Sequence, residues 1–146
     1  MPVVKGCNLP DDLYYDVDNN IWFRDMGDGT VKLGMTAVAT AMAGQLVAFT
    51  PKKAGKAIDA GKSCATIESG KWVGPAKSAA GGEVVQVNAA LVDNPKLANE
   101  DPYDKGWMIV LKPADWAAAK AALTPGSEVA AKYEAKMAAD GFAGCA

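Results

Sequence analysis

One lysine, Lys71, lies in a sequence context that predicts an exposed attachment point. The residues before it, 64–67, alternate in a pattern typical of a β-strand, and Trp72 resumes extended structure after it. Ser69-Gly70 supplies turn residues, and we expect Gly70 to adopt a positive φ with ease. The ammonium group of Lys71 is therefore predicted to lie at the apex of a β-hairpin, where another enzyme can acylate it.

A second predicted strand supports this interpretation. The pair Gly81-Gly82 precedes an alternating segment that ends at Asn88. Two strands that flank one presented lysine favour a carrier domain, in which a covalently attached arm does the chemistry and the protein delivers it. The alternative is that Lys71 is only a solvated charge, because the chain contains many lysines and lysines are mostly exposed.

The chain contains no histidine and three cysteines. The absence of histidine excludes a Ser-His or Cys-His nucleophilic pair and a histidine metal ligand within this sequence. Cys7, Cys64 and Cys145 are too far apart for a C-x-x-C redox or zinc motif, so we expect no metal site. The strand context predicts that Cys64 is a small, partly buried side chain. Cys7 and Cys145 lie near opposite ends of the chain, and we expect them to be exposed candidates for redox chemistry.

Length and charge favour a single domain spanning residues 1–146, with a short mobile tail at about 139–146. The net charge is −2 and Arg24 is the only arginine, so the sequence lacks the basic surface that nucleic acids favour. The first residues lack the apolar core of a signal peptide, and no apolar run reaches membrane-spanning length. We therefore expect a cytoplasmic protein that binds neither nucleic acid nor membranes.

Turn residues and hydrophobic periodicity predict short strands, with helices between them and at the end of the chain. Residues 21–24 and 30–33 flank a Gly-Asp-Gly turn and should pair antiparallel. Thr36 is the expected cap of an alanine-rich helix that ends before Gly44. The remaining expected elements are strands over 45–49 and 106–111, a loop over 52–61, a short helix starting at Pro95, and C-terminal helices over 113–122 and 127–138.

Two apolar features are interpreted as packing rather than as binding surfaces. Val129, Tyr133 and Met137 form one stripe on the last helix, which we expect to dock on the sheet. Trp107 precedes an apolar strand that is predicted to cross the core, so we expect its ring to pack there.

Several motifs in one order resemble the H protein of the glycine cleavage system, a family of lipoyl carriers. The matching text lies between residue 9 and about residue 140 and comprises 12–15, 22–24, 27–36, 44–49, 68–71, 82–88, 93–103 and 106–107. The spacing from Lys71 to Gly82 is also that of the family. The resemblance implies a mainly β fold with short helices, namely a lipoyl-domain barrel-sandwich hybrid with C-terminal helices.

By this resemblance, Lys71 carries lipoate in amide linkage, and Glu68, Ser69, Gly70 and Trp72 form the hairpin that partners recognise. The protein is then not an enzyme but a substrate of a lipoate-attaching enzyme and of the enzymes that load and unload the arm. A biotin carrier fits poorly, since biotin-accepting lysines lie between two methionines, whereas Gly70 and Trp72 flank this one.

Departures from the family pattern bear on the pathway. Residues 18–22 read D-N-N-I-W where the family has D-H-E-W, and Trp72 stands where the family has alanine. Such a large aromatic is either a packing residue or an exposed plate for a partner or the arm. The altered hairpin and the cysteine-bearing tail look like the lipoate-binding proteins of bacterial sulfur oxidation, the branch that we favour from the sequence. The partners there are a heterodisulfide-reductase-like complex and sulfurtransferases.

Three alternatives stay open at this point. A glycine cleavage H protein would carry an aminomethyl group and work with glycine decarboxylase, aminomethyltransferase and dihydrolipoyl dehydrogenase. A cysteine-dependent redox protein without lipoate would use Cys7 or Cys145, although the missing histidine and C-x-x-C motif count against it. An unmodified structural or regulatory homologue would bind partners through its surface alone, but the retained Glu68, Ser69 and Lys71 argue against it.

Overall fold

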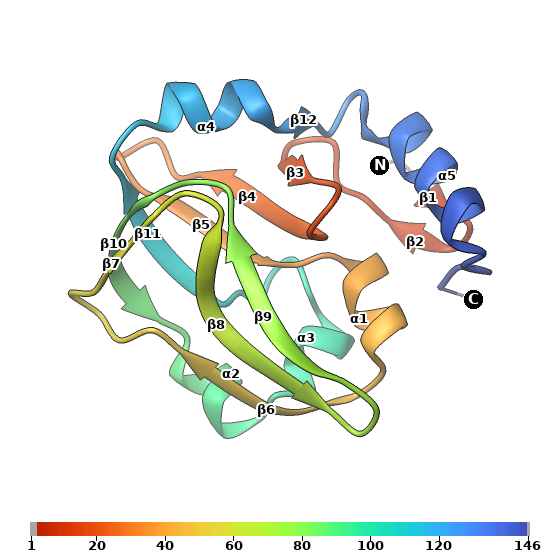
Figure 1. Cartoon of the computed structure of the whole chain (residues 1–146), viewed down its shortest axis with the longest axis horizontal. Helices are drawn as coiled ribbons and strands as arrows, with labels where there is room; N and C mark the ends of the chain where they lie inside the picture. The colour runs from red at the N-terminus through yellow and green to blue at the C-terminus, as the bar shows by residue number, and fades with distance from the viewer. Residues whose placement is uncertain (1–2, 146) are drawn as a thin grey trace.

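The computed structural model describes residues 3–145, which fold around two antiparallel sheets (Figure 1). The larger sheet contains, in spatial order, β12 (Thr124–Pro125), β3 (Tyr14–Asp16), β4 (Ile21–Asp25), β5 (Val31–Met35), β11 (Ile109–Pro113), β10 (Gly82–Val87) and β7 (Ala57–Ile58). The smaller sheet contains β6 (Leu46–Pro51), β8 (Lys62–Ser69) and β9 (Val73–Ser78). A separate pair joins β1 (Val3–Val4) to β2 (Cys7–Asn8). The mainly β fold predicted from the sequence is confirmed.

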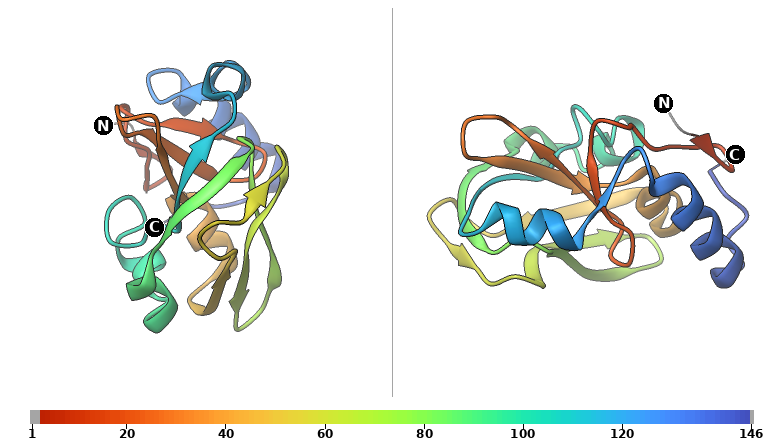
Figure 2. Two further views of the ribbon diagram at one scale, coloured as in Figure 1. Left: turned by 90° about the vertical axis from the view of Figure 1, so that its left-hand side faces the viewer. Right: turned by 90° about the horizontal axis from the view of Figure 1, so that it is seen from above.

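Short helices lie between the strands and at the end of the chain. They are α1 (Ala37–Ala43), α2 (Ala89–Asp93), α3 (Leu97–Glu100), α4 (Trp116–Ala122) and α5 (Val129–Asp140). The last two helices lie on the outside of the layered sheets, α4 along one edge and α5 at the end that also holds β1 and β2 (Figures 1 and 2).

Local sequence signals place the β4–β5 hairpin and α1 as predicted. Strands β4 and β5 pair antiparallel through five residue pairs, from Ile21 opposite Met35 to Asp25 opposite Val31. The side chain of Thr36 accepts a hydrogen bond of 3.2 Å from the backbone N–H of Ala39 and caps α1. The helix ends at Gly44, whose φ of 81° lies in the left-handed region that glycine adopts readily.

Several predicted boundaries differ from the observed ones. The helix expected from Pro113 begins at Trp116, because Pro113 still pairs with Gly82 in the sheet and Asp115 caps the helix by accepting a 3.1 Å bond from Ala118 N–H. The expected loop over 52–61 contains β7, which pairs with β10. The helix expected from Pro95 begins at Leu97. The strand expected over 106–111 runs instead from Ile109 to Pro113.

The main core fills the space between the two sheets. It is built from fully buried side chains of both, among them Phe23 and Leu33 of the larger sheet and Phe49 and Ile67 of the smaller one. Cys64 of β8 lies in this core and is fully buried, whereas partial burial was predicted. Because the smaller sheet buries one face here, its β8–β9 hairpin can extend past the core at one end (Figure 1).

A second group of buried side chains, which we call the terminal cluster, joins both ends of the chain. It comprises Val4, Cys7, Leu9, Leu13, Tyr15, Trp22, Val38, Val129, Tyr133 and Met137. The predicted stripe of α5 is buried within it, and the ring of Tyr133 packs edge-on against Tyr15 of β3 with centroids 6.3 Å apart. Trp107 packs against this cluster while Lys32 Nζ lies 5.0 Å from its ring centroid, in agreement with the packing interpretation.

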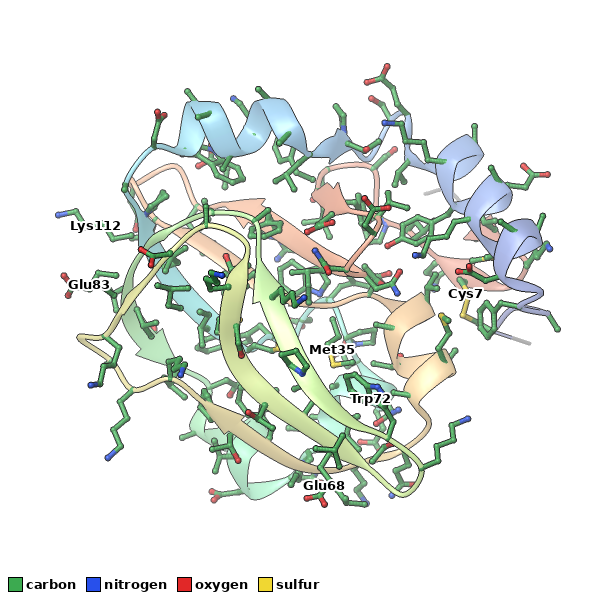
Figure 3. The ribbon with its side chains drawn as sticks, viewed as in Figure 1. Cys7, Met35, Glu68, Trp72, Glu83 and Lys112 are labelled. Atoms are coloured by element: carbon green, nitrogen blue, oxygen red, sulfur yellow. A yellow bond between two sulfur atoms is a disulfide. The ribbon has the colours of Figure 1, made fainter. Side chains whose placement is uncertain are left out.

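The sequence prediction of two exposed terminal cysteines is wrong for Cys7, which is buried, while Cys145 is partly exposed. Cys7 is 0% exposed and forms a disulfide with Cys145, 138 residues further along the chain (Figure 3). Phe142 and Cys145 pack against the terminal cluster, and the backbone N–H of Cys145 donates a 2.9 Å hydrogen bond to the carbonyl of Lys5. The tail as far as Cys145 is therefore held by a covalent bond, a hydrogen bond and packing.

Candidate functional site

Lys71 lies in the two-residue loop that closes the β8–β9 hairpin. Glu68 pairs with Val73, and the next residue, Ser69, donates a 2.8 Å backbone hydrogen bond to the carbonyl of Trp72, which leaves Gly70 and Lys71 as the loop. Lys71 is exposed, and among residues 3–145 no carboxylate forms an ion pair with it. Gly70 does not adopt the positive φ that we predicted, so this turn does not depend on the conformational freedom of glycine.

The side chain of Ser69 stabilises the loop through hydrogen bonds. Its side chain is buried, and its hydroxyl accepts a 3.3 Å hydrogen bond from the backbone N–H of Lys71 and donates a 3.4 Å bond to the carbonyl of Trp72. Glu68, by contrast, is exposed on the strand beside it (Figure 3). The serine therefore organises the turn, while the glutamate side chain is open to solvent.

The side chain of Lys71 lies over the C-terminal end of α1. A methyl group at Gly44 would come within 3.2 Å of Lys71 Cε, so glycine leaves room for the lysine there. Asn99 fixes this end of the helix, because its side-chain amide donates a 2.8 Å bond to the Gly44 carbonyl and its oxygen accepts a 2.9 Å bond from Leu46 N–H. Gly44 and Asn99 were not among the predicted site residues, although both lie in the family motifs and that was the signal for them.

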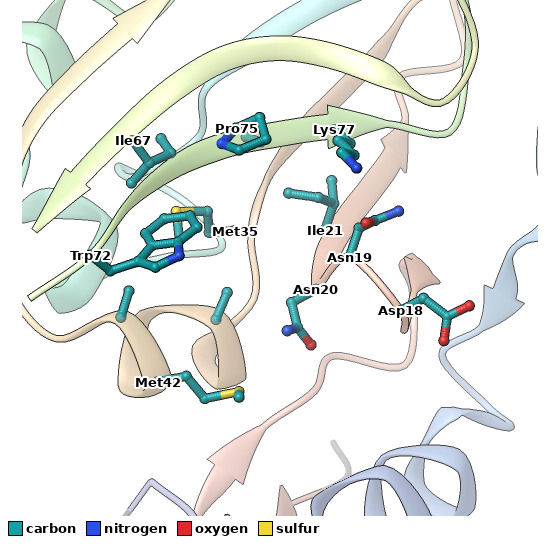
Figure 4. A pocket seen from close by; sticks show the side chains of 13 residues that line it. Asp18, Asn19, Asn20, Ile21, Met35, Met42, Ile67, Trp72, Pro75 and Lys77 are labelled. Atoms are coloured by element: carbon teal, nitrogen blue, oxygen red, sulfur yellow. The ribbon is translucent and has the colours of Figure 1, made fainter. Parts of the chain in front are cut away.

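A cavity of about 350 Å³ opens beside the hairpin, between α1 and strand β9 (Figure 4). Its apolar wall includes the side chains of Ile21, Met35, Met42 and Ile67. Its polar lining consists of Asp18, Asn19, Asn20 and Lys77. The side-chain oxygen of Asn20 is buried and has no hydrogen-bond partner within residues 3–145. The cavity thus combines an apolar surface with one unpaired acceptor and two opposite charges.

Trp72 forms part of this cavity and is also open to solvent. Its indole is 41% exposed and projects toward Met35 and the helix α1 (Figure 4). The ring folds back over Gly74, where a side chain would collide with it, so a glycine at 74 is required for this placement. Both interpretations of Trp72 therefore hold in part: the ring packs over its own strand and still offers a surface.

The cysteines do not join the hairpin in one site. Cys7 and Cys145 lie with the terminal cluster and are bonded to each other. Cys64 is buried beneath the smaller sheet, and burial raises the pKa of its thiol to about 12, so it is a poor nucleophile in the folded protein. Residues 3–145 bring no group of three or more potential metal ligands together.

The described residues suit a covalently attached, partly apolar arm. The Lys71 amine is exposed and unpaired, and the small residues Ala43 and Gly44 connect its surroundings to the cavity beneath Trp72. Such an arm can extend into solvent from the hairpin or fold back against the apolar wall. In the described part of the chain, helices long and apolar enough to cross a membrane are absent.

Comparisons with known proteins agree with this arrangement. The family model described as "Glycine cleavage H-protein" matches residues 13–136. "Glycine cleavage system H protein 5" from Aquifex aeolicus is 53% identical over 134 residues, which are 89% of this chain and 90% of that protein. The "Glycine cleavage system H protein" of Halorhodospira halophila is 41% identical over 107 residues, 73% of this chain and 82% of its own length. The crystal structure of an H protein from Mycobacterium marinum matches with a TM-score of 0.75 and 31% identity, covering 88% of this chain and 98% of that one.

Proposed function

Because the chain belongs to the glycine cleavage H-protein family, whose members are non-catalytic carriers of lipoate on a lysine, we propose that Lys71 is the lysine that carries it. The observation that carries this proposal is the position of Lys71, exposed and unpaired at the tip of a hairpin that Ser69 holds in shape. Lipoate supplies a dithiolane that can be reduced and can hold a transferred group on one sulfur. The protein supplies the attachment point, the cavity and a surface for partners, and it does so in the cytoplasm.

The cargo best supported by the comparisons is the aminomethyl group of glycine cleavage. The relatives bear the name of that system, and this evidence favours the glycine route over the sulfur-oxidation branch that the sequence alone led us to prefer. An aminomethyl group is a cation near neutral pH, and Asp18 places a carboxylate in the cavity wall to attract it. The partners on this route are glycine decarboxylase, aminomethyltransferase and dihydrolipoyl dehydrogenase.

A second cargo, sulfur, is favoured by one specific observation. Where the family has D-H-E before its tryptophan, the cavity wall here is lined by Asn19, Asn20 and Ile21, and Lys77 faces the same space (Figure 4). A sulfur adduct that carries negative charge would be attracted by Lys77 rather than by Asp18. The partners would then be a heterodisulfide-reductase-like complex and sulfurtransferases. Three differently numbered H proteins of Aquifex aeolicus are among the relatives, which is compatible with a division of tasks.

The attachment site is tested by intact-mass measurement after co-expression with a lipoate-attaching enzyme. The wild-type protein should gain one lipoyl mass and Lys71→Arg should gain none, because arginine keeps the charge but cannot form the amide. The matched control is Lys77→Arg, the same change on the same hairpin, which should still be lipoylated. A lipoyl mass on the Lys71→Arg protein would contradict the assignment. The lipoylated protein alone should show no sustained turnover with glycine or sulfur donors.

The cargo is tested by loading the lipoylated protein with each set of enzymes. Glycine and glycine decarboxylase should add an aminomethyl group, and Asp18→Asn should lower the loading several-fold while Lys77→Gln leaves it unchanged. If sulfur is the cargo, a sulfurtransferase should add sulfur to the arm instead. Lys77→Gln should then lower the sulfur loading, and Asp18→Asn should leave it unchanged. Sulfur adducts without any aminomethyl loading would reverse our preference between the two routes.

A further inference from the structure

The disulfide and the attachment lysine lie at opposite ends of the same short helix. At the C-terminal end of α1, the side chain of Lys71 passes over Gly44. At the N-terminal end, Sγ of Cys145 lies 3.5 Å from the carbonyl oxygen of Ala37. Lys71 and Cys145 are far apart in the sequence, yet both lie against α1, one at each end of the helix.

A shallow cavity of about 200 Å³ marks the path between them. It is lined by Ala37, Thr40, Ala41, Asn99 and Cys145. Asn99 also contacts the other end of the path, through its hydrogen bond to the Gly44 carbonyl. The residues on this side of α1 have small side chains, so they leave space for a thin, flexible chain.

The length of a lipoyl arm matches this path. Gly44 lies seven positions after Ala37, which corresponds to about 10 Å along an α-helix. Beyond the lysine nitrogen, a lipoyl group adds about eight bonds before its sulfurs and reaches about 10 Å. The arm can therefore bring a sulfur to Cys145 without any movement of the fold.

The two sulfurs of the disulfide differ in accessibility. Cys7 is fully buried in the terminal cluster, whereas Cys145 is partly exposed and lines the cavity. Thiol–disulfide exchange requires the attacking thiolate to approach one sulfur in line with the bond that breaks. Cys145 is thus the sulfur that can be attacked, and Cys7 is the sulfur that leaves.

We propose that the disulfide Cys7–Cys145 is a redox partner of the arm on Lys71, within the same molecule. Cys145 forms a disulfide with one sulfur of the reduced arm as the Cys7–Cys145 bond breaks, and Cys7 leaves as a thiolate that takes up a proton. Cys145 is then released, with a second proton, when the other arm sulfur closes the dithiolane. Two electrons and two protons pass from the arm to the cysteine pair, and the reverse reaction restores both. The proposal rests on lipoate at Lys71.

The structure can accommodate the reduced pair. After reduction, the Cys145 thiol would have the carbonyl of Ala37 as a hydrogen-bond acceptor at its present distance of 3.5 Å. The hydrogen bond from Cys145 N–H to Lys5 keeps the tail in place when the covalent bond is gone. An exchangeable disulfide also suits the cytoplasm, where disulfides, when present, are usually transient and redox-active.

The proposal is tested by the rate at which the disulfide is reduced. Lipoylated protein, its lipoyl mass confirmed first, is treated anaerobically with limiting dithiothreitol, quenched with acid and alkylated, and the thiols of Cys7 and Cys145 are counted by peptide mass. Because the attached arm acts at a high effective concentration, we expect reduction at least about tenfold faster than in Lys71→Arg and at a rate independent of protein concentration. Equimolar free dihydrolipoamide added to Lys71→Arg should not restore this rate.

Two further variants address the path itself. Ala41→Leu places a larger side chain between Lys71 and Cys145 and should slow the arm-dependent rate several-fold. Ala121→Leu, the same change on the exposed side of α4, should leave it unchanged. Equal reduction rates in the lipoylated wild type and Lys71→Arg would overturn the proposal and leave a purely structural disulfide. Absence of the lipoyl mass would instead overturn the proposed function on which this one rests.

Discussion

Large apolar side chains are exposed at the hairpin tip but buried in the terminal cluster. At the tip, Trp72 and Val73 are 41% and 63% exposed, and Val47 on the neighbouring strand is 58% exposed. In the terminal cluster, Tyr15, Trp22 and Tyr133 are fully buried. Exposed apolar surface of this kind is available for contact with another molecule, whereas buried aromatic rings stabilise the fold. The comparison separates a region that leaves apolar side chains exposed from a region that buries them and anchors the ends of the chain.

The cysteine sulfur atoms of the two regions also differ in bonding and accessibility. In the terminal cluster the sulfurs of Cys7 and Cys145 are bonded to each other and one of them reaches the surface. Beneath the hairpin sheet, Cys64 is a single buried thiol with a raised pKa. The sulfur nearest in sequence to Lys71 is therefore unreactive in the folded protein, whereas Cys145, the cysteine furthest from it in sequence, is the accessible one.

Removal of the disulfide should strongly reduce the stability of the protein. The double variant Cys7→Ser, Cys145→Ser loses a cross-link that closes a loop of 138 residues, and its free energy of unfolding should fall by about 2–5 kcal/mol. Guanidinium unfolding followed by circular dichroism measures this. Lipoylation of Lys71 should be unchanged, because the hairpin lies outside the terminal cluster. A loss of less than about 1 kcal/mol would show that packing alone anchors the ends.

The buried thiol of Cys64 should make the protein less stable at high pH. Its pKa is raised from 9.0 to about 12 because burial disfavours the thiolate. The folded protein therefore keeps a proton that the unfolded chain loses, so this stabilisation is complete below pH 9 and is lost as the pH rises toward 12. The expected slope from this group is about 1.4 kcal/mol per pH unit. Cys64→Ala should remove that slope in unfolding curves between pH 9 and 11, and an unchanged slope would contradict the assignment.

Substitution of Gly44 should affect both stability and the arm. Gly44→Ala forces a side chain into a φ of 81° and into contact with Lys71 Cε, and we expect a cost of about 1–2 kcal/mol and a several-fold slower lipoylation. Gly61→Ala is the matched control, because Gly61 has a φ of 80° with no atom near its added methyl. It should show a similar cost in stability and normal lipoylation. Equal lipoylation rates in both variants would show that Gly44 does not contribute to the lipoylation site.

Trp72→Ala should have the smallest effect on stability. Its indole is partly exposed at the hairpin, so we expect the free energy of unfolding to change by less than about 1 kcal/mol. Trp22→Ala, the same change at a fully buried position, should cost about 3–5 kcal/mol. Loading of the lipoylated Trp72→Ala protein by its partner enzymes should nevertheless fall several-fold. A large loss of stability for Trp72→Ala would assign this ring to the anchoring region instead.

The parts of the site that the sequence predicts are those that depend on neighbouring residues. Strand alternation and turn residues place Lys71 at a hairpin tip, and Thr36 caps α1, because each of these depends on local contacts. The family and the mainly β fold were also predicted and are confirmed. The position of Lys71 as the lipoyl site stays a prediction.

The parts that the sequence did not predict depend on distant residues. The cavity is assembled from segments around Asn20, Ala39, Ile67 and Trp72, which only the folded chain brings together. The pairing of Cys7 with Cys145 could not be deduced either, since proximity to the ends of the chain was taken as a sign of exposure and not of contact between them. The start of α4 was misplaced because pairing of Pro113 in the sheet outweighed its preference for a first helical turn.

The disulfide between residues 7 and 145 closes the oxidised chain between them into a covalent ring. A single cut in any peptide bond between these residues would open the ring without releasing a fragment. Exposed loop tips are the preferred sites of such cuts, and the hairpin loop contains Lys71, a residue after which trypsin cleaves. A nicked oxidised protein would therefore migrate as one molecule until a reductant separates its two pieces, and an acylated lysine at the tip would resist that cut altogether.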